Sequence, residues 1–173
     1  MQLTANPTAE LTWWIEGTQE QYRITANVYL VPHLEHPLRS QFEHTLSLSK
    51  DGTGLALFKD EDWESRRLEM FKSMSPYMKA TWCRPVPGSR LIGGREEAKR
   101  WPERIEDPSA HEHLPDAKYN ELLWKQALKN FALVIIDPIE VDLLELGVFP
   151  NRRTRFFKSA ENHGLWDEED LVP

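Results

Sequence analysis

Two polar side chains, Gln21 and Arg23, have the types and the spacing to bind a planar polar ligand. They lie two residues apart in an alternating run, which predicts that they share one strand face about 7 Å apart. A glutamine amide both donates and accepts hydrogen bonds, and an arginine suits a phosphate or a carbonyl. Trp13 and Trp14 on the facing strand add aromatic walls for such a ligand. The alternative is that Gln21 and Arg23 simply lie on the solvated face of a hairpin.

A second group of cationic residues precedes a stiff turn. Lys79 and Arg84 bring positive charge next to Pro85-Val86-Pro87-Gly88. Because proline fixes its own backbone, the N–H groups around Pro87 and Gly88 could be held where an anion binds. The alternative is a plain surface connection, which is the commoner meaning of a Pro-x-Pro-Gly turn.

A third group consists of Arg152, Arg153 and Arg155 near the C-terminal end. In a strand, Arg153 and Arg155 share one face and Arg152 points to the other. Three arginines in a chain of net charge -7 indicate an anionic ligand such as a phosphate. The alternative is a solvated edge whose arginines form salt bridges with nearby acids.

Other reactive side chains form no convincing site. His33 with His36, and His111 with His113, are spaced as metal ligands can be, but each pair lies in polar loop sequence without a third ligand. We therefore expect solvated histidines and no metal. Cys83, the only cysteine, has no histidine at a telling spacing, so no catalytic residue is identified.

The elements that position these groups follow from hydrophobic periodicity and turn signals. Alternation predicts a hairpin, helical spacing predicts helices that start at Asp60 and at Ser75-Pro76, and three late strands follow a third helix. The expected strands are 9–16, 21–31, 131–137, 140–146 and 153–158, and the expected helices are 60–74, 75–82 and 116–130. We expect the apolar run 131–137 to be buried on both faces. The residues Glu168, Glu169 and Asp170 read as an acidic tail.

Two segments lack a clear pattern. Residues 32–59 contain leucines on either side of a turn-rich stretch and are interpreted as an insertion, either a hairpin or a loop. Residues 89–113, rich in proline and glycine, are expected to form a long loop. The predicted fold class is α+β with mostly antiparallel strands, in a single domain over 1–173.

Composition excludes several classes of protein. The net charge of -7 and the absence of a basic run argue against nucleic acid as a partner. The longest strongly apolar run, Phe131 to Ile136, is far too short to cross a bilayer, so we expect no membrane association. No secretory signal is visible, and a single cysteine excludes an intrachain disulfide, which fits a cytoplasmic protein.

Several motifs resemble those of the pyridoxamine 5'-phosphate oxidase-like FMN-binding proteins. The run Trp13-Trp14, followed by Gln19-Glu20-Gln21-Tyr22-Arg23, resembles the central hairpin of that family. The segment from Ser75-Pro76 to Pro85-Val86-Pro87-Gly88 is similar to a branch with a Pro-x-Pro-Gly signature. Trp166 and Pro173 are similar to the closing tryptophan-to-proline ending. The similarity covers most of the chain in order, apart from 32–59 and 89–113.

This resemblance implies a split β-barrel of the FMN-binding type with flanking helices, which forms a homodimer with FMN at the subunit interface. It implies that Gln21 contacts the flavin, that Arg155 helps to hold the cofactor phosphate or ring, and that the segment around Pro87 and Gly88 is a second flavin contact. The expected cofactor-binding residues are, in full, Gln21, Arg23, Lys79, Arg84, Pro87, Gly88, Arg152 and Arg155.

The chain departs from the family pattern in three places. Leu144 replaces a tryptophan of the late strand, and Asp170 replaces an arginine before the terminal Leu-x-Pro, so a vitamin B6 substrate is in doubt. Family members also carry a stretch ahead of the hairpin that supplies barrel strands and phosphate-binding groups. The resemblance therefore implies an N-terminally truncated barrel, because Met1 falls just ahead of that hairpin.

Three functions are open at this point. The first is an FMN-dependent oxidoreductase that acts on a small amine or a related substrate, with the flavin doing the redox chemistry. The second is a flavin-binding module without catalysis, or a dimer partner of a full-length relative. The third is a truncated remnant without a ligand.

Overall fold

The computed structural model describes residues 6–49, 53–110, 116–159 and 165–173. The chain divides into two compact units. We call the first the sheet unit; it consists of Met1–Leu30, Ser40–Glu61 and Val134–Pro173. The second, the helical unit, consists of Val31–Arg39 and Asp62–Leu133. Three segments of the chain form the sheet unit and two form the helical unit, and the prediction of one domain over 1–173 stays a prediction.

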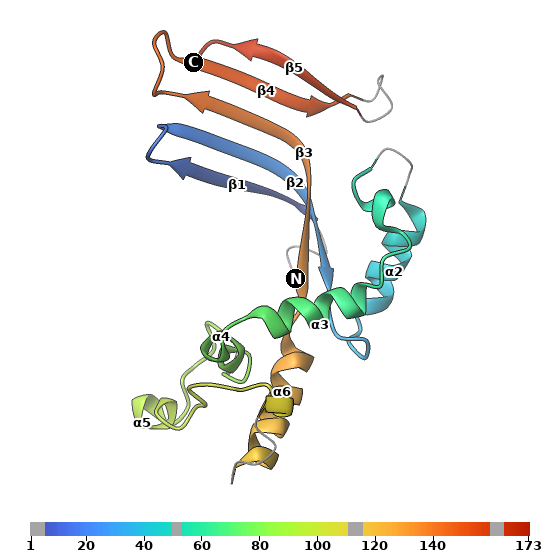
Figure 1. Cartoon of the computed structure of the whole chain (residues 1–173), viewed down its shortest axis with the longest axis vertical. Coiled ribbons are helices and arrows are strands. Elements are labelled where there is room, and N and C mark those ends of the chain that lie inside the picture. Colours follow the sequence, from blue (N-terminus) through green and yellow to red (C-terminus); the bar gives the residue numbers. More distant parts are fainter. Residues whose placement is uncertain (1–5, 50–52, 111–115, 160–164) are drawn as a thin grey trace. The chain divides into compact units, whose positions relative to one another are not determined.

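The sheet unit is built on five antiparallel strands whose order in space equals their order in the chain (Figure 1). The strands are β1 (Thr8–Ile15), β2 (Glu20–Val31), β3 (Leu133–Glu145), β4 (Arg152–Lys158) and β5 (Trp166–Leu171). β1 and β5 are therefore the two edges of the sheet. This arrangement, together with the helices, confirms the predicted α+β class and the antiparallel strands.

The hairpin of β1 and β2 matches the sequence prediction to within a residue. Trp14 lies directly opposite Gln21, and Trp13 lies opposite Tyr22. Gln19 in the connecting turn has a positive φ of 55°, a conformation that such tight connections often require. The alternating pattern was sufficient here because the two strands pair with each other and need no distant contact to define them.

β3 is one strand where the sequence predicted two, because Pro138 does not interrupt it. A proline lacks only its own N–H donor and can occupy an extended backbone. The expectation that 131–137 is buried on both faces was wrong, since Val134 is 50% and Ile136 43% exposed.

The acids expected to form a tail instead belong to a strand. Glu169 of β5 lies directly opposite Arg155 of β4 and forms an ion pair with it. Asp170 lies opposite Thr154 and accepts a hydrogen bond from its hydroxyl at 3.3 Å. Cross-strand pairs of this kind stabilise a sheet, which explains how a sequence so rich in acids adopts a β-strand.

The segment 32–59 is helical and contains no hairpin among its described residues. It forms α2 (Arg39–Leu48) and the short 3-10 helix η1 (Leu55–Phe58). Phe42 and Leu55 are 4% and 2% exposed, and both lie in the part of the segment that belongs to the sheet unit, Ser40–Glu61. The prediction failed because Leu46 and Leu48 alternate like strand residues, whereas Phe42 and Leu46 are spaced by one helical turn.

The helical unit contains α3 (Trp63–Ser73), α4 (Pro76–Thr81), α5 (Gly94–Ala98), η2 (Pro108–Ala110) and α6 (Ala117–Asn130). α3 begins two residues later than predicted, because Asp62 rather than Asp60 accepts the Ser65 N–H at 3.0 Å. The predicted cap of α4 is confirmed: Ser75 Oγ accepts the Met78 N–H at 3.2 Å, and Pro76 opens the helix. The expected long loop 89–113 contains α5 and η2.

A compact aromatic core stabilises the helical unit. The buried cluster consists of Phe71, Ala80, Ile105, Trp124, Ala127 and Phe131. The Phe71 ring meets Trp124 edge-on with centroids 5.0 Å apart, and Trp82 meets Phe131 in the same way at 5.3 Å. Edge-to-face pairs add stability beyond the area that they bury.

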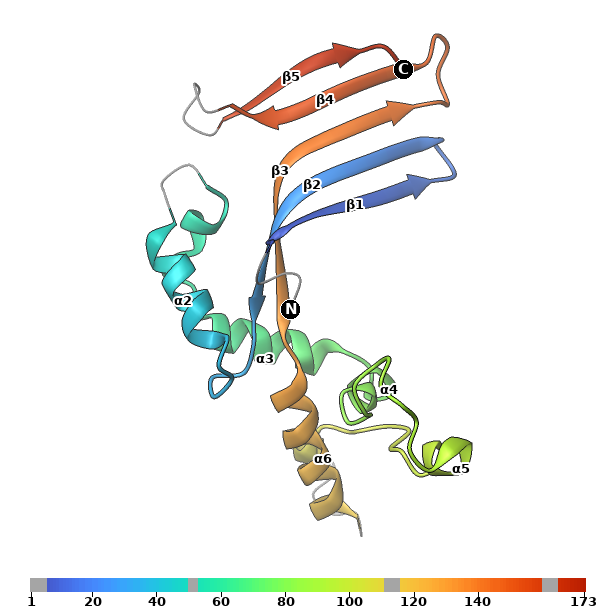
Figure 2. The ribbon, with the colours of Figure 1, turned by 180° about the vertical axis from the view of Figure 1, so that it is seen from behind.

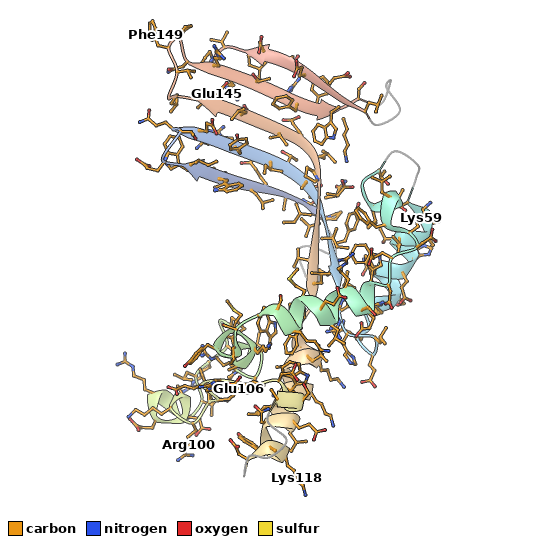
Figure 3. The ribbon with its side chains drawn as sticks, viewed as in Figure 1. Lys59, Arg100, Glu106, Lys118, Glu145 and Phe149 are labelled. Atoms are coloured by element: carbon orange, nitrogen blue, oxygen red, sulfur yellow. The ribbon has the colours of Figure 1, made fainter. Side chains whose placement is uncertain are left out.

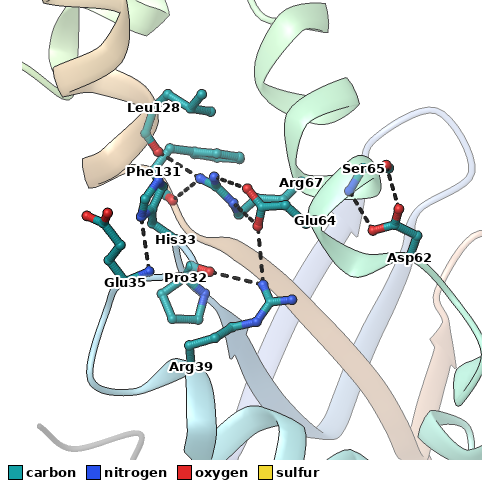
Figure 4. A network of polar contacts seen from close by, with 10 residues as sticks. All are labelled: Pro32, His33, Glu35, Arg39, Asp62, Glu64, Ser65, Arg67, Leu128 and Phe131. Carbon is teal, nitrogen blue, oxygen red and sulfur yellow. Dashed lines mark hydrogen bonds and ion pairs between the residues drawn. The ribbon is translucent and has the colours of Figure 1, made fainter.

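A fully buried arginine ties α3 to the end of α6 (Figure 4). Arg67 Nη1 donates to the carbonyl oxygens of Leu128 and Phe131 at 2.7 and 3.0 Å. Its Nε and Nη2 donate to the two carboxylate oxygens of Glu64 at 3.1 and 2.6 Å. The last carbonyl groups of a helix have no partner within the helix, so Arg67 supplies the donors that the end of α6 lacks.

Candidate ligand-binding face of the sheet

A small pocket opens on one face of the sheet where β2, β3 and β4 lie side by side; Figure 2 shows these strands from behind. It encloses about 50 Å³ and is lined by Gln21, Arg23, Asp142, Leu144, Arg153 and Pro173. The Leu146 N–H donates to the Gln19 carbonyl at 2.9 Å, which joins the start of β2 to the end of β3. The sheet thereby brings Gln21 and Arg23 beside residues that are more than a hundred positions away in the sequence.

The pocket contains a tightly paired acid and base. Arg153 donates to Asp142 through two nitrogens, Nε to Oδ1 at 3.0 Å and Nη2 to Oδ2 at 2.6 Å. This hydrogen bonding lowers the pKa of Asp142, against the opposing effect of burial, and the positive charges of Arg153, Arg23 and Arg155 lower it further. Asp142 therefore stays ionised, and its negative charge balances the positive charge of Arg153.

Gln21 and Arg23 carry the unused polar groups of this face. Within the described part of the chain, neither side chain makes a hydrogen bond or an ion pair, and Arg23 is exposed. Because Arg153 is already hydrogen-bonded to Asp142, the guanidinium of Arg23 is the cationic group of the described pocket that has no hydrogen-bond partner. Such a pair can bind a neutral polar edge, such as neighbouring carbonyl and N–H groups, or one anionic group.

Arg155 lies on the same face but does not line the pocket. Its guanidinium carbon is 5.1 Å from the centroid of the Phe157 ring, and it forms an ion pair with Glu169. Its Nε is buried and has no hydrogen-bond partner among the described residues. A buried donor of this kind is costly to leave unpaired.

Only one of the paired tryptophans shares the face of Gln21. Trp14 lies opposite Gln21, is 42% exposed, and donates from Nε1 to Glu16 Oε2 at 2.6 Å. Trp13 is on the other face, where its ring centroid is 6.3 Å from that of Tyr22. The aromatic wall expected beside the pocket is therefore a single ring.

Two of the predicted cations do not lie on this face: Arg152 is on the opposite face of the sheet, and Lys79 is buried in the helical unit. Arg152 is exposed on the opposite face of β4. Lys79, in the helical unit, is only 4% exposed; its Nζ donates to the Lys72 carbonyl at 2.9 Å and lies 4.9 Å from the Trp124 ring centroid. Burial lowers the pKa of Lys79. The anion contact predicted for Lys79 is thus not supported, because its ammonium group faces the core.

The remaining predicted residues, Arg84, Pro87 and Gly88, form an exposed turn of the helical unit. The Ser89 N–H donates to the Val86 carbonyl at 3.0 Å, and Gly88 has a φ of 81°. Proline followed by a positive-φ glycine fits a type II turn, as the sequence indicated. The anion contact of this turn stays a prediction.

Sequence reasoning missed Asp142 and Pro173 as pocket residues; it named Arg153 in the third group of arginines but left it out of the expected cofactor-binding residues. The sequence did contain a signal for Asp142. Asp142 and Leu144 alternate onto one face of the predicted strand 140–146, and Arg153 alternates onto one face of the strand after it. The missing information was the order of the strands, which places these faces together.

Other features offer no second site. The Nδ1 atoms of His33 and His36 accept the backbone N–H groups of Glu35 and Leu38 at 3.2 and 3.1 Å, so both histidines stabilise local turns. His111 and His113 lie outside the described residues. Among the residues that are described, no three histidine, cysteine or acidic side chains gather as metal ligands would. None of the described helices combines the length and the apolar character that a membrane span requires.

Taken together, the fold and the pocket define an α+β protein with a small polar pocket on one face of an antiparallel sheet. The fold is similar to that of a pyridoxamine 5'-phosphate oxidase-related, FMN binding protein from Nostoc punctiforme PCC 73102, with a TM-score of 0.62 and 21% sequence identity. The similarity covers 99% of this chain and 66% of that protein's chain. No protein-family pattern matches the sequence, and no curated protein is detectably related to it. The likeness therefore establishes the fold.

Proposed function

We propose that this chain binds FMN on the sheet face that carries Gln21 and Arg23. The observation that carries the proposal is the convergence of these two unpaired side chains on one pocket. It gains weight because the fold resembles that of an FMN binding protein over 99% of this chain.

The chemistry of the pocket fits the polar edge of a flavin ring. That edge presents carbonyl oxygens next to an N–H group, which a glutamine amide matches with its own acceptor and donors. The guanidinium of Arg23 can donate to a flavin carbonyl, and Trp14 adds an aromatic surface next to Gln21. The carboxylate of Asp142 would repel a phosphate dianion bound at the same place, so this pocket suits the edge of the flavin ring better than the phosphate.

The size of the pocket limits what one chain encloses. At about 50 Å³ it is far smaller than a typical small-molecule site of roughly 300–1,000 Å³. The pocket can thus receive an edge of the ligand but not the whole ring system. We propose that a second copy of the chain, in a homodimer, supplies part of the remaining surroundings.

The proposed role of this chain is binding, and any redox chemistry would be supplied by the flavin when it is bound. Among the side chains that line the described pocket, Asp142 has the one carboxyl group, and Arg153 holds it in the ionised form. It is therefore poorly suited to donate a proton. This observation favours a flavin-binding module, and oxidation of a small amine is the second proposal.

Titration of FMN fluorescence with the purified chain tests binding. We expect quenching that saturates, and dissociation constants for Arg23→Ala and Gln21→Ala raised by roughly tenfold and a few-fold, as expected for losing a charged and a neutral hydrogen bond. Arg152→Ala is the matched control, because Arg152 is exposed on the opposite face of β4. Absence of quenching by the wild-type chain, or equal loss in all three variants, would contradict the proposal.

Anaerobic mixing of the FMN-loaded chain with pyridoxamine 5'-phosphate or another small primary amine separates the two functions. A catalytic protein bleaches the visible absorbance of the flavin as the flavin is reduced. For a binding module, the absorbance stays unchanged while the flavin remains bound.

A further inference from the structure

A long segment of the helical unit lies outside its core. Every residue from Arg84 to Glu96 is exposed, and none of the residues between Trp82 and Ile105, all of which the structure describes, is buried. We call residues 84–96 the arginine arm. Figure 1 shows α5, in which the arm ends, apart from α3 and α6. The side chains of the arm are therefore open to contact with another molecule.

Both ends of this exposed segment are fixed to the core of the helical unit. At one end, the Trp82 ring meets Phe131 edge-on with centroids 5.3 Å apart, and the Trp82 carbonyl accepts Asn130 Nδ2 at 2.7 Å. At the other end, Ile105 is fully buried and its N–H donates to the Pro76 carbonyl at 3.0 Å. Exposed loops whose ends are held by a scaffold are frequent binding elements, because the scaffold positions them for a partner.

The charge of the arm is opposite to that of the whole chain. It carries Arg84, Arg90 and Arg95, and no acidic residue lies between the first and the last of them, in a chain of net charge -7. Within the described part of the chain, none of the three guanidinium groups makes a hydrogen bond or an ion pair. The arm therefore presents three positive charges that the fold itself leaves unmatched.

The acids that follow these arginines in the sequence are already paired with other cations. Lys99 Nζ lies 2.7 Å from Glu96 Oε1, and Arg100 Nη1 lies 3.2 Å from Glu97 Oε2. These carboxylates thus balance a lysine and an arginine in and just after α5. The charge of the arm is left for a partner to balance.

Aliphatic side chains alternate with the arginines of the arm. Val86, Leu91 and Ile92 are 75%, 43% and 83% exposed. Single exposed apolar residues are ordinary, but three within seven positions of one exposed segment form a surface that a partner could cover. Arginines next to apolar groups are also enriched among the residues that dominate the binding energy of protein interfaces.

We propose that the arginine arm is a docking surface for an acidic peptide segment of a partner protein. Carboxylates of the partner pair with the guanidinium groups of the arm, which match their planar geometry, and apolar side chains of the partner cover the aliphatic residues of the arm. The arm contains no aromatic residue. This favours a polypeptide over a single-stranded nucleic acid, because bases bind largely by stacking on aromatic rings.

Fluorescence anisotropy of a fluorescein-labelled peptide that alternates glutamate and leucine, titrated with the full chain without flavin, tests the docking surface. We expect a dissociation constant of about 10–100 μM. Arg90→Glu should raise it at least about tenfold, because it replaces an attraction by a repulsion, and Ile92→Ser at least about threefold. A peptide with glutamine in place of glutamate should bind at least about tenfold more weakly.

Two exposed residues of α6 provide matched controls outside the arm. Lys118→Glu makes the same reversal of charge as Arg90→Glu, and within the described residues Lys118 has no ion pair either. Leu122→Ser removes an aliphatic side chain that is 65% exposed, as Ile92→Ser does. Neither control should change the dissociation constant by more than about twofold. Circular dichroism shows that each variant is folded.

Several results would overturn this docking surface. The peptide could fail to bind at ~500 μM chain, well above the expected dissociation constant, or Arg90→Glu and Lys118→Glu could weaken it equally. Tighter binding of a single-stranded thymidine oligonucleotide than of the peptide would make the partner a nucleic acid. Self-association of the wild-type chain that Arg90→Glu abolishes would make it a second copy. Displacement of the peptide by FMN would assign the arm to the flavin. Because the peptide titration contains no flavin, its failure is distinct from a failure of FMN binding.

Discussion

Replacement of Arg67 by methionine should strongly destabilise the helical unit. The Arg67 side chain is fully buried, and its guanidinium makes four hydrogen bonds to Leu128, Phe131 and Glu64. Methionine fills a similar volume but donates nothing, so two carbonyl oxygens at the end of α6 lose their donors. Each buried acceptor left without a partner costs about 1–3 kcal/mol. Glu64 keeps its ion pair with Arg39 at 3.3 Å, so it is not left alone.

Two such acceptors sum to a loss of about 2–6 kcal/mol in the free energy of unfolding, which brackets the loss of about 3–5 kcal/mol found when one partner of a buried pair is removed. That is a large share of a typical domain stability of about 5–15 kcal/mol. Urea unfolding followed by circular dichroism measures it. Arg66→Met is the matched control: its side chain is 52% exposed and lies 3.9 Å from Glu69, a surface pair worth at most about 1 kcal/mol. If Arg67→Met costs no more than this control, the reasoning about the buried guanidinium is refuted.

Three further predictions concern the sheet and a helix cap. Gly147→Ala should cost about 1–3 kcal/mol, because the added methyl group overlaps the backbone carbonyl of Thr18, whereas Gly17→Ala has open space and should cost little in the same urea assay. The pKa of Asp142 is lowered by its arginine partner, so its contribution to stability is present above the unfolded-state pKa and is lost as the pH falls through the folded-state pKa. Asp142→Asn should accordingly flatten the acid side of the stability–pH curve, and an unchanged curve would contradict this. Ser75→Ala removes the cap of α4 and should lower the unfolding free energy by about 1 kcal/mol; full retention of stability would argue against the cap.

The sequence predicted those helices and strands correctly for which a single local pattern, such as alternation or a helix cap, is sufficient. The hairpin followed from alternation, and the cap at Ser75-Pro76 followed from side-chain chemistry that acts within one turn of the chain. The helix α6 followed from its apolar spacing. Each of these depends on contacts between residues that are close in sequence, so no knowledge of the rest of the fold was needed.

The errors lie where distant contacts decide. α2 was read as an inserted hairpin or loop because its helical form depends on burying Phe42 in the sheet unit. β5 was read as a tail because its acids are compensated by partners on β4, such as Arg155. Lys79 was interpreted as a cation that could contact an anion beside the Pro-x-Pro-Gly turn, whereas aromatic rings and the Lys72 carbonyl enclose its ammonium group. No local pattern distinguishes a buried lysine of this kind from an exposed one.

The candidate site shows the same division. The shared face of Gln21 and Arg23 could be read from alternation, but the partners of that face come from β3 and β4. Side chains on these strands are displayed along the whole sheet, and Figure 3 shows Glu145 near one end of β3 and Phe149 in the turn that follows. Phe149 is 99% exposed, so not every side chain near this end of the sheet packs against a neighbour. Only the strand order identifies Asp142 and Arg153 as members of the pocket.

The central claim is that the unpaired groups of Gln21 and Arg23 contact the flavin. An NMR titration with FMN that follows the Gln21 side-chain amide and the Arg23 Nε–H resonances tests it directly, with the Nε–H of Arg152 as the internal reference. We expect the resonances of Gln21 and Arg23 to shift and saturate together with the fluorescence titration, while the Arg152 resonance stays in place. If FMN saturates the protein and the Gln21 and Arg23 resonances do not move, the flavin binds elsewhere and the proposed face is wrong.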